Sequence, residues 1–206
     1  PASSGVNLTA LNASNLGSGT VPTARLGSGT ASSSTILYGD QTYKTEPASG
    51  GITEADTWYL TSNITGGAAP ISSNLSRMGF GGFALLGTGM TESSGVFTFP
   101  STGHWEITFQ GLCQGSNISD GSYFMTHIGV TENDSSWVDV DSHGACIIDH
   151  STSVNASAMS KTILDVTDVT THKVRFATQV SDSAMITGGS ASELQTCMFF
   201  IRLADT

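Results

Sequence analysis

Residues 95–109 have the sequence GVFTFPSTGHWEITF, and this stretch decides the fold. Its first half alternates apolar and polar residues and stops at Pro100, which has no N–H to donate to a neighbouring strand. After Gly103, the same alternation places Trp105, Ile107 and Phe109 on one face. The stretch therefore predicts two strands, each with one apolar face.

Further strand-like segments occur on both sides of this stretch, and none of them shows a helical period of useful length. They cover residues 58–61, 79–86, 123–130, 137–140, 158–166, 173–180 and 196–203. Gly, Asn, Asp and Ser separate them, as expected for turns. Many short strands between such turns favour an all-β sandwich or barrel.

The central stretch resembles the signature of C1q/TNF-like domains, in which a Gly-x-Phe-x-x-Pro strand turns into a strand of alternating aromatics. Residues 160–166 with 173–176 look like the family's next hairpin, and residues 197–203 look like its closing apolar strand. The resemblance covers roughly residues 56–206. It implies a ten-stranded jelly roll that forms a homotrimer. One departure is Thr171-His172, where the family often has Gly-Asp, so the geometry of that turn stays open.

The N-terminal part contains a repeat. Residues 15–20, Asn-Leu-Gly-Ser-Gly-Thr, recur as Arg-Leu-Gly-Ser-Gly-Thr at residues 25–30. One such unit cannot bury its single Leu within its own chain, but units from several chains wound around one axis could. We therefore predict an extended fibre shaft over 1–45, a hinge over 46–55 and a jelly-roll head over 56–206. A flexible Gly/Ser linker is the alternative for 1–45.

The repeats carry a second resemblance. Residues 11–26 are similar to repeats of bacteriophage tail-fibre and other virion-fibre proteins. Tyr38-Gly39-Asp40-Gln41-Thr42-Tyr43 resembles the Gly-Asp-Gly-x-Trp ending common in those fibres, with Gln41 in place of Gly. This resemblance implies a fibre whose repeats precede a terminal globular head.

Composition excludes several functional classes. The formal net charge is −10 with only seven Lys and Arg, so there is no basic patch for nucleic acid. No run of about 18 apolar residues predicts membrane insertion, and no signal-peptide pattern is visible. The chain begins with Pro1, so we expect a processed product, an expressed fragment or part of something longer.

No catalytic motif is present, so we predict that the protein is not an enzyme. The sequence lacks a Gly-x-Ser-x-Gly elbow, a His-Glu-x-x-His pair, a P-loop and a dinucleotide fingerprint. The five histidines at 104, 127, 143, 150 and 172 are scattered, although three of them could converge. The three cysteines at 113, 146 and 197 show no metal-ligand spacing and are interpreted as buried free thiols that fill space. A disulfide is the alternative, although no spacing supports one.

The best candidate site is the segment from Thr131 to Asp141. It combines Trp137 with the acidic residues Glu132, Asp134, Asp139 and Asp141. An indole can pack on the apolar face of a sugar while carboxylates accept its hydroxyls. The alternative is that Trp137 starts a buried strand and the acids point to water. We predict no cofactor and no metal site; Ca²⁺ held by loop oxygens is the one cofactor alternative. Residues 181–190 form a second candidate, expected as an exposed tip.

Together these observations predict a structural and adhesive virion fibre protein, in a phage tail or capsid fibre. Its expected partners are two further copies of itself, other virion proteins and a host-surface glycan or receptor. Three weak sites in one trimer would supply affinity by multivalency. Two alternatives remain: an architectural module that only trimerises and decorates the virion, and a secreted cellular C1q-like ligand.

Overall fold

The computed structural model describes residues 25–45, 51–83, 85–147 and 150–206, without the side chains of 150–152. The chain divides into two units after Gly50. The first copy of the repeat, residues 15–20, and residues 46–50 of the predicted hinge lie outside the described residues. Residues 51–55, the rest of that hinge, fall in the second unit.

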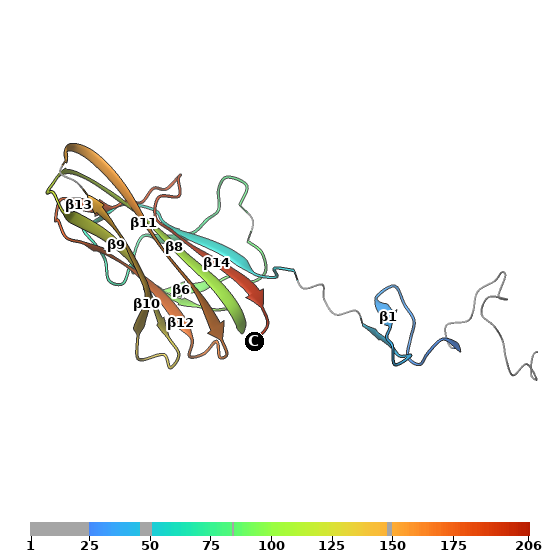
Figure 1. Cartoon of the computed structure of the whole chain (residues 1–206). Coiled ribbons are helices and arrows are strands. Elements are labelled where there is room, and N and C mark those ends of the chain that lie inside the picture. Colours follow the sequence, from blue (N-terminus) through green and yellow to red (C-terminus); the bar gives the residue numbers. More distant parts are fainter. Residues whose placement is uncertain (1–24, 46–50, 84, 148–149) are drawn as a thin grey trace, which may run out of the picture. The chain divides into compact units, whose positions relative to one another are not determined.

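The described residues form strands and no α-helix (Figure 1). The first unit contains β1 (Thr35–Leu37) and β2 (Tyr43–Thr45). The second contains β3 (Ala55–Leu60), β4 (Ile64–Thr65), β5 (Leu75–Arg77), β6 (Thr91–Ser93), β7 (Val96–Thr98), β8 (Gly103–Ile118), β9 (Ser122–Thr131), β10 (Val138–Ile147), β11 (His150–Val166), β12 (Lys173–Val180), β13 (Met185–Thr187) and β14 (Cys197–Ala204).

The first unit shows why the repeat uses glycine. Ser28 N donates to Gln41 O at 2.9 Å, and Tyr43 N donates to Ser28 O at 2.8 Å, so the second repeat copy lies flush against the turn between β1 and β2. A Cβ on Gly27 would stand 2.3 Å from Gln41 O, which no larger residue could accept without a backbone shift. Gln41 occupies the position of a Gly in the fibre ending that this segment resembles, and it has a φ of 61° in the left-handed region.

This unit does not bury its apolar side chains. Leu26, Ile36 and Leu37 remain 43%, 42% and 43% exposed. The prediction that one unit cannot bury its Leu within its own chain is therefore confirmed for the described copy.

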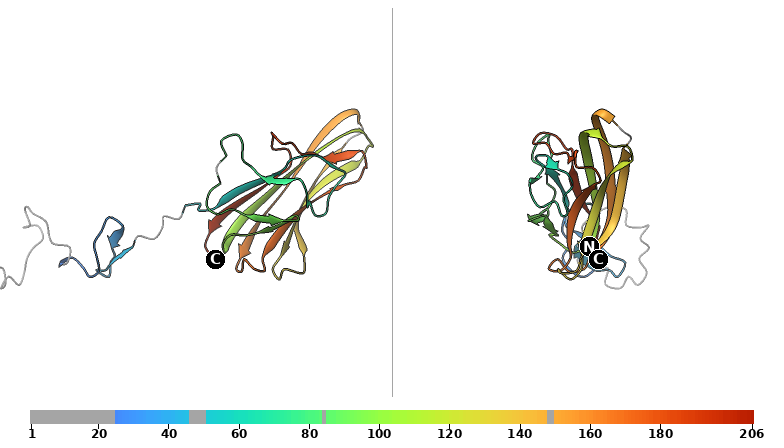
Figure 2. Two further views of the ribbon diagram at one scale, coloured as in Figure 1. Left: turned by 180° about the vertical axis from the view of Figure 1, so that it is seen from behind. Right: turned by 90° about the vertical axis from the view of Figure 1, so that its left-hand side faces the viewer.

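The second unit is a sandwich of two antiparallel sheets (Figure 2). One sheet has five strands in the order β10-β9-β12-β7-β6. The other has seven, in the order β4-β13-β8-β14-β3-β5, with β11 paired along β8. The strand total exceeds the ten that the family resemblance implies, because short strands such as β4 and β5 extend the second sheet.

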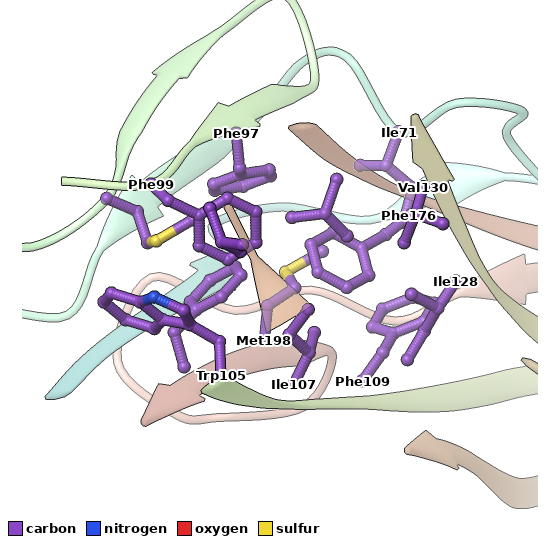
Figure 3. Close-up of a cluster of buried hydrophobic side chains, with 14 of the residues drawn as sticks. Ile71, Phe97, Phe99, Trp105, Ile107, Phe109, Ile128, Val130, Phe176 and Met198 are labelled. Atoms are coloured by element: carbon purple, nitrogen blue, oxygen red, sulfur yellow. The ribbon is translucent and has the colours of Figure 1, made fainter. Parts of the chain in front are cut away.

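The faces predicted for the central stretch are confirmed. Trp105, Ile107 and Phe109 of β8 are 0% exposed and point into the space between the sheets (Figure 3). Phe97 of β7 meets Phe176 of the same sheet and Phe200 of the opposite sheet, each at a centroid distance of 5.4 Å. The core is thus an aromatic layer contributed by both sheets.

Two expectations need correction, and the turn whose geometry the sequence left open can now be described. Residues 79–83 and 85–86 form no strand, and Gly81 and Gly82 there have positive φ, which interrupts the extended backbone. Residues 181–190 are not a fully exposed tip, because β13 places Met185 and Thr187 in the interior. At the turn before β12, Asp168 takes the place of a Gly-Asp pair: its carbonyl accepts from His172 N at 2.9 Å and its carboxylate accepts from Thr170 N at 2.8 Å.

The cysteines differ from one another in exposure. Cys113 and Cys197 are buried free thiols, as predicted, but Cys146 is exposed on β10, so the interpretation of all three as buried is wrong. Burial raises the pKa of the Cys113 thiol and raises that of Cys197 to about 11.

We expect one thiol per folded chain to react with an aromatic disulfide reagent at pH 8, and three after denaturation. Only thiolates react, and the fraction of Cys197 present as thiolate at that pH is roughly one in a thousand. The Cys146→Ser variant should lose the fast reaction. A fast phase that survives this change would show that one of the two other cysteines is accessible.

Candidate functional site

The candidate segment connects β9 to β10 at one end of the five-stranded sheet, and Asn133 organises it. The side-chain oxygen of Asn133 accepts hydrogen bonds from Ser135 N at 3.0 Å and from Ser136 N at 2.8 Å. It also accepts from the hydroxyl of Thr131 at 3.1 Å. Asn133 thereby closes a compact turn, and Trp137 follows this turn directly before β10 begins.

Trp137 does not belong to the buried core. It is half-buried, and the guanidinium of Arg175 lies 4.4 Å from the centroid of its ring. Arg175 comes from β12, which lies two strands from β10. The expectation that Trp137 starts a buried strand is therefore wrong for this chain, because Trp137 packs on a surface arginine and β10 is mostly exposed. The other part of that alternative, that the acids point to water, is confirmed for Glu132, Asp134 and Asp139, which are exposed.

Asp139 lies next to this pair, across Gly129. Strand register aligns Asp139 of β10, Gly129 of β9 and Arg175 of β12 in one row. A Cβ on Gly129 would stand 3.1 Å from Asp139 Oδ1 and 3.2 Å from Arg175 Cγ. The missing side chain of Gly129 thus lets the carboxylate and the arginine approach each other over the middle strand.

Asp141 serves a different purpose from Asp139. The register of β9 and β10 shifts between these residues, so that Asp139 pairs with Gly129 but Asp141 with Ile128. The Asp141 carboxylate accepts a hydrogen bond from Lys161 N of β11 at 2.5 Å and lies 3.1 Å from the Nδ1 of His143. It therefore links β10, the terminal strand of the five-stranded sheet, to β11 of the seven-stranded sheet.

The other two acids of the segment lie elsewhere. Glu132 lines a separate hollow of about 310 Å³ together with Val138 and Val140. Asp134 is exposed, has a φ of 55° and donates its backbone N–H to Thr171 O at 3.1 Å. Of the five predicted residues, the structure thus brings only Trp137 and Asp139 together on one surface.

Within the described part of the chain, no group of three or more His, Cys, Asp or Glu side chains could hold a metal ion. His127 faces the outer surface of the five-stranded sheet, His143 approaches Asp141, and His172 is buried at its turn. The side chain of His150 lies outside the described residues. The described histidines therefore do not converge, and the Ca²⁺ alternative stays a hypothesis without a preformed cluster.

A larger hollow of about 400 Å³ opens on the same outer face and shares Asp139; we call it the outer hollow. It is lined by Gly67, Ala68, Ala69, His127, Asp139, Ala177, Thr178, Gln179 and Val180. The sequence alone did not point to this hollow or to Arg175, because their residues come from segments more than a hundred positions apart. Only the pairing of β12 with β9 and with residue 68 brings these segments together.

No family model and no curated protein matches this sequence. No described helix is long and apolar enough to cross a membrane. Among solved structures, the chain is similar to the Eiger TNF of S. frugiperda, with 12% identity, a TM-score of 0.53 and coverage of 75% of this chain and 95% of that one. It is also similar to murine APRIL, with 9% identity, a TM-score of 0.51 and coverage of 73% and 98%. The second unit of the chain therefore has the all-β jelly-roll fold of TNF-like proteins.

Proposed function

We propose that this protein is a homotrimeric fibre component of a virion, whose jelly-roll head contacts the surface of a host cell. The proposal joins the TNF-like fold of the head to the virion-fibre resemblance of the N-terminal repeats. Other virion proteins would bind the N-terminal end of this protein. The head would act by binding, and no chemical reaction is proposed for it.

The observation that supports the trimer is a set of exposed and half-buried apolar side chains on β11 and β14, on the outer face of the seven-stranded sheet; we call this set the apolar row. On β11, Met159 and Ile163 are 53% and 58% exposed. Strand register places them beside Gln110 and Glu106 of β8, whose other side carries the half-buried Phe199 and Ile201 of β14. Lys161, between Met159 and Ile163 on β11, forms an ion pair with Glu106 at 2.9 Å, so polar groups lie among these apolar side chains. Apolar side chains gathered on a sheet face are stabilised when a second surface covers them. Further copies of the same face supply that cover.

This arrangement decides which aromatic side chains could meet at a trimer axis. Phe109 of β8, Phe124 of β9 and Phe199 of β14 come from three of the longer strands. Phe109 and Phe124 are 0% exposed inside the sandwich, so they stabilise the single head. Phe199 points to the outer face and is available to a neighbouring copy.

The outer face of the five-stranded sheet is then free for a partner. It carries Trp137, Arg175 and Asp139, an aromatic ring with a cation and a carboxylate on a rigid sheet. Repetition of this surface three times per head favours adhesion by multivalency.

The two alternative functions require different surfaces on the head. A purely architectural head needs the apolar row but no outer-face partner. A secreted C1q-like ligand is compatible with the TNF-like neighbours, but it gives no reason for the Leu-Gly-Ser-Gly-Thr repeats.

The adhesive function is tested with particles that carry the protein. Replacing Trp137 and Asp139 by Ala should slow adsorption to host cells roughly tenfold or more, because all three weak sites of a trimer are lost together. The trimer should stay intact, since neither residue belongs to the core. Glu193→Ala, which removes an exposed carboxylate on the loop before β14, is the matched control.

Unchanged adsorption of a correctly assembled double variant would support the architectural alternative. Absence of the protein from purified particles would favour the secreted ligand instead.

A further inference from the structure

The outer hollow is a dip in the surface of the five-stranded sheet, and small residues create it. Ala177 of β12 lies between His127 of β9 on one side and the segment 67–69 on the other. Residues 67–69 are Gly-Ala-Ala, and a Cβ on Gly67 would stand 2.4 Å from Thr178 O. This close approach lets the segment continue the sheet beside β12, so the floor is backbone and methyl groups.

Polar side chains stand around this apolar floor. Asp139, His127 and Gln179 all line the hollow. Within the described chain, the side chains of Asp139 and His127 have no hydrogen-bond or ion-pair partner, while Gln179 Nε2 donates to the hydroxyl of Tyr123 at 3.1 Å. A carboxylate, an imidazole and an amide therefore offer acceptors and donors to a ligand.

The size and charge of the hollow limit what it can take. A volume of about 400 Å³ is at the small end of ligand pockets, which suits one ring-sized group rather than a peptide. An acidic ligand would meet the Asp139 carboxylate and a chain of net charge −10. The nearby cation, Arg175, is already stacked on Trp137. A neutral ring with one apolar face and several hydroxyls fits these groups.

We infer that the outer hollow binds one neutral pyranose unit of a surface polysaccharide. The C–H face of the sugar lies on Ala177 and Ala69. Its hydroxyls donate to the Asp139 carboxylate and exchange hydrogen bonds with His127 and Gln179. The Trp137–Arg175 pair lies outside the hollow, beside Asp139 on the same face. This inference rests on the proposed adhesive function and names its ligand class.

The test uses the full chain on immobilised dextran, mannan and oligomers of N-acetylglucosamine, with alginate as the acidic probe and chitosan as the cationic one. Binding to at least one neutral probe is expected, and none to alginate. Ala177→Leu should weaken that binding at least about tenfold by filling the floor, and Asp139→Asn by a similar factor through the lost charged acceptor. Ala191→Leu and Asp134→Asn, exposed positions outside the hollow, are the matched controls and should bind as the unchanged chain does.

Retention of no neutral probe, preference for alginate or chitosan, or unaltered binding by Ala177→Leu would overturn the inference. The result is separable from the adsorption experiment. If particle adsorption depends on Trp137 and Asp139 but no neutral sugar binds, the adhesive function stands and this ligand class fails. If a neutral sugar binds through Ala177 and Asp139 but adsorption is insensitive to them, the ligand class stands and the adhesive function fails.

Discussion

The Met159→Asp/Ile163→Asp double variant is expected to have the native mass of a single 21.3 kDa chain, whereas the unchanged protein should have three times that mass. Both side chains are more than half exposed in the single chain, so the change does not disturb its core. In a trimer they would be buried, and burying two unpaired carboxylates per chain costs several kcal/mol. Light scattering coupled to size-exclusion chromatography measures both masses.

The control for this experiment is Val138→Asp. Val138 is 61% exposed, but it lies on β10 of the five-stranded sheet, so this variant should keep the trimer mass. A native mass of 21.3 kDa for the unchanged protein would refute the trimer itself. A double variant that stayed trimeric would move the interface away from β11.

Phe97→Ala is expected to lower the free energy of unfolding by about 3–5 kcal/mol, the usual cost of removing a fully buried phenyl ring. Phe97 is 0% exposed and stands at the centre of the aromatic layer. Its ring contacts Trp58 edge-to-face at 5.4 Å, and it also meets Phe176 and Phe200. The truncation therefore leaves a cavity bordered by both sheets, which their strand pairing prevents from closing.

Chemical denaturation followed by tryptophan fluorescence measures this loss, at one protein concentration for all variants because assembly adds to stability. Leu86→Ala provides the comparison, since Leu86 is 44% exposed and should cost less than about 1 kcal/mol. An effect of Phe97→Ala as small as that of Leu86→Ala would mean that Phe97 does not occupy the core.

The series of short strands between turn residues was enough to predict the all-β class, and alternation was enough to predict the core face of β8. Trp105, Ile107 and Phe109 were assigned to one face from spacing alone, and all three are fully buried. This works because side chains on a strand point to alternate sides, so one apolar face must be covered. The same logic failed at residues 79–86, where apolar residues occur without regular alternation and glycines with positive φ break the extended backbone.

The candidate site was less accessible to sequence reasoning. The segment 131–141 was correctly singled out as carrying an aromatic and acids, but its five candidate residues were treated as one cluster. A register shift between Asp139 and Asp141 sends the second carboxylate toward β11. A sequence pattern does not specify such a shift, because it depends on how β10 packs against its neighbours.

By itself, the sequence determined which residues are apolar, where strands alternate and where a Gly-containing repeat precedes them, because these are local properties of the chain. Tertiary structure alone decided that Arg175 stacks on Trp137, that Gly129 opens space beside Asp139, and that Gly67 to Ala69 border a hollow with Ala177. These neighbours meet through the pairing of strands that are distant in sequence. Backbone hydrogen bonds form between almost any residue types, so the sequence pattern of one strand does not specify which side chains of another strand will lie beside it.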